Sequence, residues 1–194
     1  MSEIYTIGYS GFGVEDFVAT LKKHSINLLI DVRSCPHSAY RKDFNRRNIL
    51  HVLEADGIIY RHFGREFGAR QFNPEFFTDG VLDFEKFAQS TQFLDGVKKF
   101  EEAVKLGYKI AFMCAEKHPK NCHRCILVAR AFHDKKYEIR HILDAENFIT
   151  QADVEKILVD EHYKNFSLFE PFDYDKAVKQ SYIWQSWKIL HKFR

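Results

Sequence analysis

The sequence lacks the features that would place the protein in a membrane or outside the cell. No run of apolar residues approaches the ~18–20 needed to span a bilayer, and the opening Met1-Ser2-Glu3 does not begin a signal peptide. Only four of the 194 residues are cysteine, which without a signal argues against a disulfide framework. We therefore expect a cytoplasmic protein with reduced thiols and no membrane partner.

Basic and acidic residues nearly balance, 29 against 27, and the common cofactor motifs are missing. The formal net charge is only +2, so the chain is not a polycation that coats nucleic acid. It contains neither a dinucleotide-binding fingerprint nor a phosphate-loop sequence, which disfavours nicotinamide-dependent or ATP-driven chemistry. We expect no cofactor.

The residues that are present predict a folded α/β protein. Hydrophobic residues make up 45% of the chain, and its 19 phenylalanines predict an aromatic core. Short apolar runs predict strands at 4–8, 26–32, 58–60, 109–114 and 138–143. Helical spacing is found at 12–24, 45–55, 82–106 (with a break near Ser90-Thr91) and 122–133, and 61–80 reads as a loop with at most short helical turns. This alternation predicts three layers, a mostly parallel sheet with helices on both faces.

We expect one domain with an extension. Residues 1–150 would form the α/β domain, and residues 151–194 a helical and then irregular extension packed on it. The extension is rich in aromatic residues, which would be poorly soluble if left exposed. It could close over the domain or make a homodimer. Its aromatic residues are Phe166, Phe169, Phe172, Tyr174, Tyr182, Trp184 and Trp187.

The functional site is expected where parallel strands end, because ligands of open parallel sheets bind beyond the carboxyl ends of the strands. Three predicted strands end in unusual polar sequences. These are Gly8-Tyr9-Ser10, Asp31-Val32-Arg33 and Cys114-Ala115-Glu116.

The segment that follows the predicted strand 109–114 carries the strongest evidence for a functional site. Asn121 is a plausible helix N-cap, which would put Cys122, His123 and Arg124 in the first turn, where free N–H groups favour an anion or a thiolate. A thiol at such a position can have a lowered pKa. Arg124 would hold phosphate or carboxylate, and Glu116 would serve as general acid or base if desolvated.

Structural interpretations compete with these roles. Cys125 lies on the helix interior and is expected to be plain core, and Cys114 could be packing. Glu116 could be an ion-pair partner of Arg124 or Arg33. Asp31 is interpreted as a hydrogen-bonding anchor, whereas Arg33 is expected to point toward a ligand anion.

Zinc is a further alternative, with candidate ligands among Cys114, Glu116, His118, Cys122, His123 and Cys125. The chain has only one Cys-x2-Cys pair, whereas familiar zinc modules have two ligand pairs. Because that pair lies in a helix start, its members would point in different directions. We therefore expect no metal site.

A second group of residues, the arginines and aromatic residues between residues 40 and 77, gives weaker evidence for a nucleotide-like partner. Between residues 40 and 77 arginines interleave with aromatic residues, a pattern that can hold phosphates and stack bases. A solvated helix face above an aromatic core would show the same pattern.

The motifs together resemble a prokaryotic family known only as domain of unknown function 488. Thr6-Ile-Gly-Tyr-Ser10, Asp31-Val-Arg33 with Pro36 and Ser38, Gly57-Ile58 with Tyr60, Cys114-Ala-Glu116 and Cys122-His-Arg124 occur in the family's order, over about residues 3 to 145. The resemblance implies a compact α/β domain whose motif residues line a shared site, and it supplies no activity. Tyr9 stands where the family often has His, which argues against a mechanism that needs a base there.

The leading hypothesis is an enzyme, a hydrolase or group transferase, that acts on a phosphate-bearing substrate related to nucleotides or nucleic acid. Arg33 and Arg124 would hold the anion together with His123, and Gly8, Tyr9, Ser10 and Cys114 would line the pocket. Glu116 would do acid/base work, and Cys122 would be a nucleophile or a thiol donor. The alternatives are a non-catalytic module that senses nucleotides or nucleic acid, and a thiol-based metal or redox protein.

Overall fold

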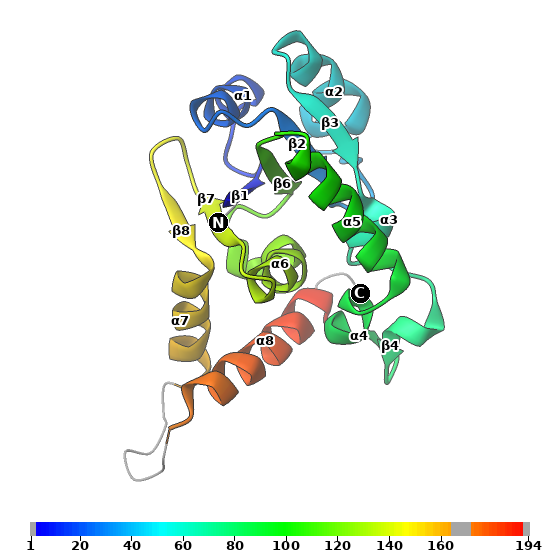
Figure 1. Ribbon diagram of the computed structural model, residues 1–194, viewed down its shortest axis with the longest axis vertical. Helices are drawn as coiled ribbons and strands as arrows, with labels where there is room; N and C mark the ends of the chain where they lie inside the picture. Colours follow the sequence, from blue (N-terminus) through cyan, green and yellow to red (C-terminus); the bar gives the residue numbers. More distant parts are fainter. Residues whose placement is uncertain (1–2, 164–171, 192–194) are drawn as a thin grey trace.

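A six-stranded sheet forms the centre of the protein (Figure 1). The computed structural model describes residues 3–163 and 172–191. The strand order is β3-β2-β6-β1-β7-β8, and every pairing is parallel except that of β8 with β7. The strands are β1 (Glu3–Gly8), β2 (Leu28–Asp31), β3 (Ile59–His62), β6 (Ile110–Cys114), β7 (Glu138–Ile142) and β8 (Phe148–Thr150).

Helices cover both faces of this sheet, because successive strand residues point to opposite sides. Ile30 and Phe112 belong to one buried cluster, and Leu29 and Met113 belong to the other. The cluster with Leu29 is closed by α1 (Val14–Lys23) and α2 (Arg46–Ala55). The opposite cluster is closed by α5 (Thr91–Lys105), the π-helix η4 (Arg124–Ala129) and α6 (Arg130–Asp134). The predicted three-layer, mostly parallel α/β fold is confirmed.

The chain leaves two neighbouring strands in opposite directions. After β1 it crosses through α1 to β2, and after β6 it crosses on the other face through η4 and α6 to β7. Such a reversal opens a crevice at the carboxyl ends of the strands. The polar sequences that follow β1, β2 and β6 therefore meet at one edge.

The interrupted region between β3 and β6 contains only short elements before α5. They are α3 (Gly64–Phe67), η2 (Pro74–Phe76), the two-stranded hairpin of β4 (Phe77–Thr78) and β5 (Val81–Leu82), and α4 (Phe84–Ala88). The predicted helix break falls between α4 and α5, where the Ser90 side chain accepts a hydrogen bond from the backbone N–H of Phe93. Ser90 is thus the N-cap of α5.

The extension consists of two helices, α7 (Gln151–His162) and α8 (Tyr174–His191). The expectation of an irregular end was wrong for 174–191, which form one continuous helix. This helix runs past α6 toward α4 (Figure 1) and buries Tyr182 and Ile189 in the same cluster as Phe112. Phe166 and Phe169 lie outside the described residues. Trp184 and Trp187 keep 38% and 44% of their surface exposed.

No helix in the described part of the chain has the length and apolar character needed to cross a membrane.

Candidate functional site

A cavity of about 260 Å³ lies at the carboxyl edge of the sheet. Its walls come from the segments that follow β1, β2 and β6 and from the start of the helix that contains η4. Six of the residues singled out in the sequence line it, namely Tyr9, Arg33, Cys114, Glu116, Cys122 and His123.

Asp31 and Arg33 form a buried ion pair at the end of β2. The Nη2 and Nε atoms of Arg33 donate to the Asp31 carboxylate at 2.6 Å and 2.9 Å. The backbone N–H of Arg33 and the hydroxyl of Tyr60 donate to the same carboxylate, at 3.0 Å and 2.6 Å. Asp31 is fully buried, and these four donors make it an anchor that positions Arg33.

The guanidinium of Arg33 is only partly used by this network. Its Nη2 also donates to the carbonyl of Phe44 at 2.8 Å, whereas its Nη1 is buried and has no hydrogen-bond partner among the described residues. Burial by itself lowers the pKa of Arg33, but the hydrogen bonds and charge of Asp31 raise it above its ordinary value. Arg33, which lines the cavity, is therefore a fixed cation with an unused donor at its buried Nη1.

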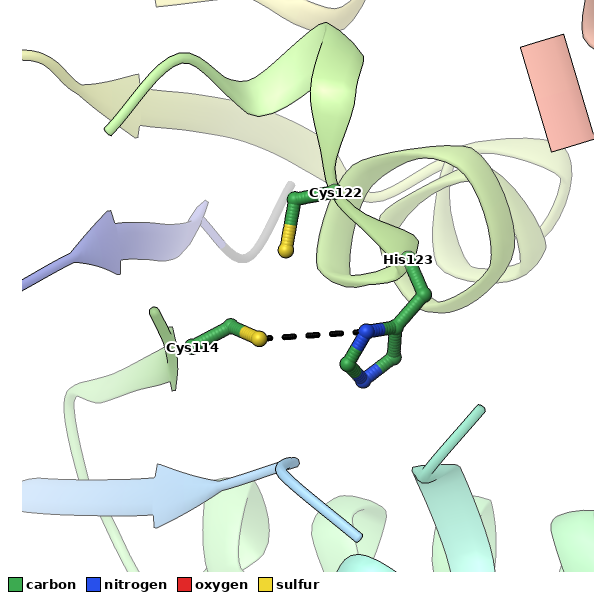
Figure 2. A group of neighbouring side chains, drawn as sticks. All are labelled: Cys114, Cys122 and His123. Carbon is green, nitrogen blue, oxygen red and sulfur yellow. Dashed lines mark hydrogen bonds between the residues drawn. The ribbon is translucent and has the colours of Figure 1, made fainter. Parts of the chain in front are cut away.

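Cys114, Cys122 and His123 form a compact cluster in the same cavity (Figure 2). Each residue is at most 5% exposed, and the two Sγ atoms and a ring nitrogen all lie within 4.8 Å of one another. The Sγ of Cys114 is 3.8 Å from Nδ1 of His123. On the far side of the ring, Nε2 lies 2.9 Å from the carbonyl of Val32. A carbonyl only accepts, so Nε2 carries a proton and donates it.

The three groups perturb one another's pKa. Burial raises the pKa of the Cys122 thiol, but the Cys114 thiol, Arg124 and His123 together lower it well below its usual value. Burial lowers the pKa of His123, but the neighbouring Cys122 raises it by more, so the pKa lies above its usual value. The hydrogen bond with Cys122, followed by burial, raises the pKa of Cys114. These shifts make Cys122 the thiol of the pair that loses its proton more readily.

Arg124 has a different position from the one expected for an anion ligand. It is fully buried, and its Nη1 and Nη2 donate to the carbonyls of Glu116 and Lys117, the second at 3.0 Å. Its Nε donates to the hydroxyl of Thr6 at 3.3 Å. The guanidinium thus holds the loop after β6 through two of its carbonyls and does not line the cavity.

Gly8 and Ser10 also contact this loop without lining the cavity. A Cβ atom on Gly8 would lie 1.8 Å from the carbonyl oxygen of Glu116, so only glycine permits the close approach. The backbone N–H groups of Tyr9 and Ser10 donate to the carbonyls of Cys114 and Ala115, at 3.1 Å and 2.9 Å. The Tyr9 ring lines the cavity and stacks on Phe44 with 4.5 Å between centroids.

Glu116 faces the cavity but remains exposed to solvent. The desolvation expected for its acid/base role is therefore absent at this position. No hydrogen bond or ion pair of its carboxylate with Arg33 or Arg124 is found in the described structure, so the ion-pair interpretation has no support.

The helix start differs by one residue from the prediction. The first carbonyl to accept helical hydrogen bonds is that of Cys122, from the N–H groups of Cys125 and Ile126. Asn121 instead ends the 3-10 helix η3 (Pro119–Asn121). Its side-chain oxygen accepts a hydrogen bond from Gln185 of α8 at 3.4 Å.

Cys125 points away from the cavity, as expected of a core residue. Its Sγ lies 3.6 Å from Nε2 of His141 and 3.6 Å from the side-chain oxygen of Gln151. Burial, and then the charge of Arg124, lower the pKa of His141 to about 3. Together with Thr6 and Tyr182, these residues form a buried polar network that joins the domain to α7 and α8.

Sequence reasoning missed several residues of the cavity wall. Ser34, Cys35 and His37 line it without having been singled out, whereas Ser38 of the family motif and Arg70 line it as well. Ser34, Cys35 and His37 closely follow the Asp31-Val32-Arg33 motif, so extending the strand-end argument along the loop would have found them. Arg70 is contributed by the segment after α3 and is one of the arginines that interleave with aromatic residues between residues 40 and 77.

Fold and site together define a mostly parallel α/β domain with a cysteine, histidine and arginine cavity at its switch point. The chain belongs to the family described as Domain of unknown function DUF488, whose model matches residues 13–131. The motifs that end β2 and β6 and the Cys122-His-Arg124 triplet lie inside this match, and Gly8-Tyr9-Ser10 precedes it. No curated protein and no solved structure matches the chain.

Proposed function

We propose that this protein is an enzyme that binds a small phosphate-bearing substrate, such as a nucleotide or another nucleic-acid constituent, and acts on it by hydrolysis or group transfer. The observation that supports this proposal is the buried, unpartnered Nη1 of Arg33 in a cavity that also contains Cys114, Cys122 and His123. The cavity thus combines a donor for an anion with a reactive centre.

The state of Arg33 favours an anionic ligand. A buried donor without a partner costs about 1–3 kcal/mol, and a hydrogen bond between charged groups contributes about 1.5–3 kcal/mol. An oxygen of a phosphate group would satisfy the guanidinium, whose planar fork suits phosphate and carboxylate. Arg70 and His37 line the same cavity, and Glu116 is the one carboxylate in its lining, so donors outnumber acidic groups.

The volume limits the substrate. A cavity of about 260 Å³ is close to the lower end of the ~300–1,000 Å³ typical of small-molecule sites. It suits a phosphate ester or part of one nucleotide. A longer nucleic acid would place only one terminal group inside.

Cys122 and Glu116 are the chemical groups that we assign to the reaction. Cys122 lies beside His123, and a cysteine in such a setting can act as a nucleophile or as a ligand to a metal ion. Glu116, exposed at the cavity wall, would take up or return a proton. All four cysteines are free thiols, which suits the reducing cytoplasm where we place the protein.

A turnover screen tests the proposal. The full chain would be offered nucleoside mono-, di- and triphosphates and chromogenic phosphate mono- and diesters, with products followed by ³¹P NMR. We expect turnover of at least one compound, a KM raised about 10- to 100-fold in Arg33→Lys because one charged hydrogen bond is lost, and a reduced kcat in Glu116→Gln. Arg47→Lys, on the exposed side of α2, is the matched control and should behave as wild type.

Two results would count against this assignment. If compounds bind in an Arg33-dependent way but none is turned over, the protein is a sensor and not an enzyme. If no phosphate-bearing compound binds, the cavity has another ligand.

A further inference from the structure

The cysteine and histidine cluster has the donor set and spacing of a metal site. Two sulfur atoms and one imidazole nitrogen, all within 4.8 Å of one another, are contributed by Cys114, Cys122 and His123. The sulfur of Cys122 points toward that of Cys114, and the Cys114 sulfur and Nδ1 of His123 face each other (Figure 2). Thiolate and imidazole are the ligands that Zn²⁺ uses most often in proteins.

His123 is already oriented for such a role. Its Nε2 donates to the carbonyl of Val32 at 2.9 Å, and in metal sites the second ring nitrogen of a histidine ligand usually makes this kind of bond. Nδ1 therefore has its lone pair free on the cavity side. Zinc bonds of ~2.3 Å to sulfur and ~2.0–2.1 Å to nitrogen at a tetrahedral angle separate the two ligand atoms by about 3.6 Å. The 3.8 Å between Cys114 Sγ and Nδ1 is close to this value.

The backbone that carries the ligands is held in place on both sides. Cys114 ends the central strand β6, and its carbonyl accepts a hydrogen bond from the N–H of Tyr9. Cys122 and His123 begin the buried helix, and Arg124 holds the intervening loop through its carbonyls. Little rearrangement is needed to bind an ion.

We propose that Cys114, Cys122 and His123 bind one Zn²⁺ and leave its fourth position open to the cavity. Three protein ligands and one open position are typical of catalytic zinc, whereas structural sites have four. Two thiolates and a neutral imidazole balance the ion's charge, so both thiols lose their protons to solvent on binding. The zinc would polarise a substrate oxygen or activate a bound water beside Arg33 and Glu116. This inference deepens the proposed function and rests on it for the substrate, but not for the metal.

Cobalt and zinc titrations of the full chain test the site. The protein would be stripped with a chelator, kept under reductant, and titrated with Co²⁺ and then with Zn²⁺ against a chromophoric competitor. We expect one ion per chain, thiolate-to-cobalt charge-transfer absorption, and the visible bands of tetrahedral cobalt. Cys114→Ser and Cys122→Ser should each abolish the charge-transfer pattern of two thiolates and weaken zinc binding by at least about 100-fold, more than the loss of an outer-shell partner.

Cys35→Ser is the matched control, because Cys35 is an exposed thiol that lines the same cavity. It should leave the cobalt spectrum and the zinc affinity unchanged. Circular dichroism would establish that each stripped variant is folded. As a second readout, zinc should raise the melting temperature of wild type and Cys35→Ser but not of the two cluster variants.

Several outcomes would overturn the zinc site. These are a folded, reduced wild type that binds neither ion, a Cys35→Ser variant that loses the site, or a cluster variant that keeps it. Arg33→Lys separates this inference from the proposed function, because it should retain zinc and lose phosphate affinity. If zinc does not bind but Arg33-dependent phosphate binding persists, only the metal is wrong. If zinc binds and no phosphate compound does, the proposed function is wrong.

Discussion

Gly8→Ala should disrupt the loop that forms one wall of the cavity. The new methyl group would lie 1.8 Å from the Glu116 carbonyl oxygen and 2.9 Å from Nη1 of Arg124. Contacts of a Cβ under 3.0 Å essentially never occur, so the carbonyl must move by at least about 1.2 Å. The hydrogen bond from Arg124 to that carbonyl then breaks or lengthens.

The expected loss of stability follows from these contacts. A buried guanidinium deprived of its acceptor costs about 1.5–3 kcal/mol, and weakening the neighbouring N–H bonds of Tyr9 and Ser10 adds about 0.5–1.5 kcal/mol each. We therefore expect Gly8→Ala to lower the free energy of unfolding by about 2.5–6 kcal/mol. Because Cys114 and Glu116 lie on this loop, ligand binding in the cavity should fail as well.

Urea denaturation of three glycine variants provides the assay. Gly13 has an ordinary φ of −68° and a nearest neighbour at 3.4 Å, so Gly13→Ala should be close to wild type. Gly57 has a φ of +72° and open space, so Gly57→Ala should cost only the ~1–2 kcal/mol of a left-handed backbone. If Gly8→Ala proves no more harmful than Gly57→Ala, the close approach of β1 to the loop is not what positions the wall.

Three further predictions concern the buried polar groups. Arg33→Met should lower the free energy of unfolding in urea by about 3–5 kcal/mol, because Asp31 stays buried without its countercharge; a loss below 1 kcal/mol would show that the pair contributes little. The pKa of His141 is about 3, below the 6.5 of an exposed histidine. Below about pH 6.5 the unfolded chain therefore binds a proton that the folded chain does not. The free energy of unfolding then falls by up to about 4 kcal/mol as the pH drops toward 3. Wild type should therefore lose stability more steeply than His141→Asn over this range, and equal slopes in acid denaturation would contradict a buried neutral ring. Tyr182→Phe removes the acceptor of Gln151 at 2.6 Å and should cost about 1–3 kcal/mol by thermal or urea unfolding, whereas no change would mean that α8 does not depend on this contact.

The central part of the fold could be predicted because each layer leaves a local pattern. Leu28-Leu29-Ile30 and Ile110-Ala111-Phe112-Met113 are buried on both faces and so read as continuous apolar runs. The break before α5 was found because Ser90 is an N-cap. β8 was not predicted, since its three residues become a strand only by pairing with β7 at the sheet edge.

The last helix escaped prediction for a related reason. Two of the positions that α8 buries are Ser181 and Gln185, so its packed face is not marked by apolar residues alone. The polar partners of that face are supplied by other elements. Gln185, for example, donates to the carbonyl of Lys120 at 2.8 Å.

The site was only partly readable from the sequence. The strand-end rule located Arg33, Cys114 and the start of the helix with Cys122, because parallel strands bring their carboxyl ends to one edge. It could not show which of the adjacent His123 and Arg124 faces the cavity. The side-chain directions depend on the π-helical turn and on the loop carbonyls that capture Arg124.

The same limit applies to the metal ligands. Spacing alone offered the pair Cys122 and Cys125, whereas the structure groups Cys122 with Cys114 and His123. The grouping depends on how far the loop after β6 folds back over the strand. Gly8 and Arg124 fix that distance, and neither belongs to a recognisable ligand motif.

Calorimetric titration of pyrophosphate into wild type and Arg33→Lys, with Arg47→Lys as control, tests whether the cavity binds anions through Arg33. We expect one site per chain, an affinity reduced about 10- to 100-fold in Arg33→Lys, and no change in Arg47→Lys. Equal affinity for all three proteins, or no binding to a folded wild type, would contradict an anion site built on Arg33.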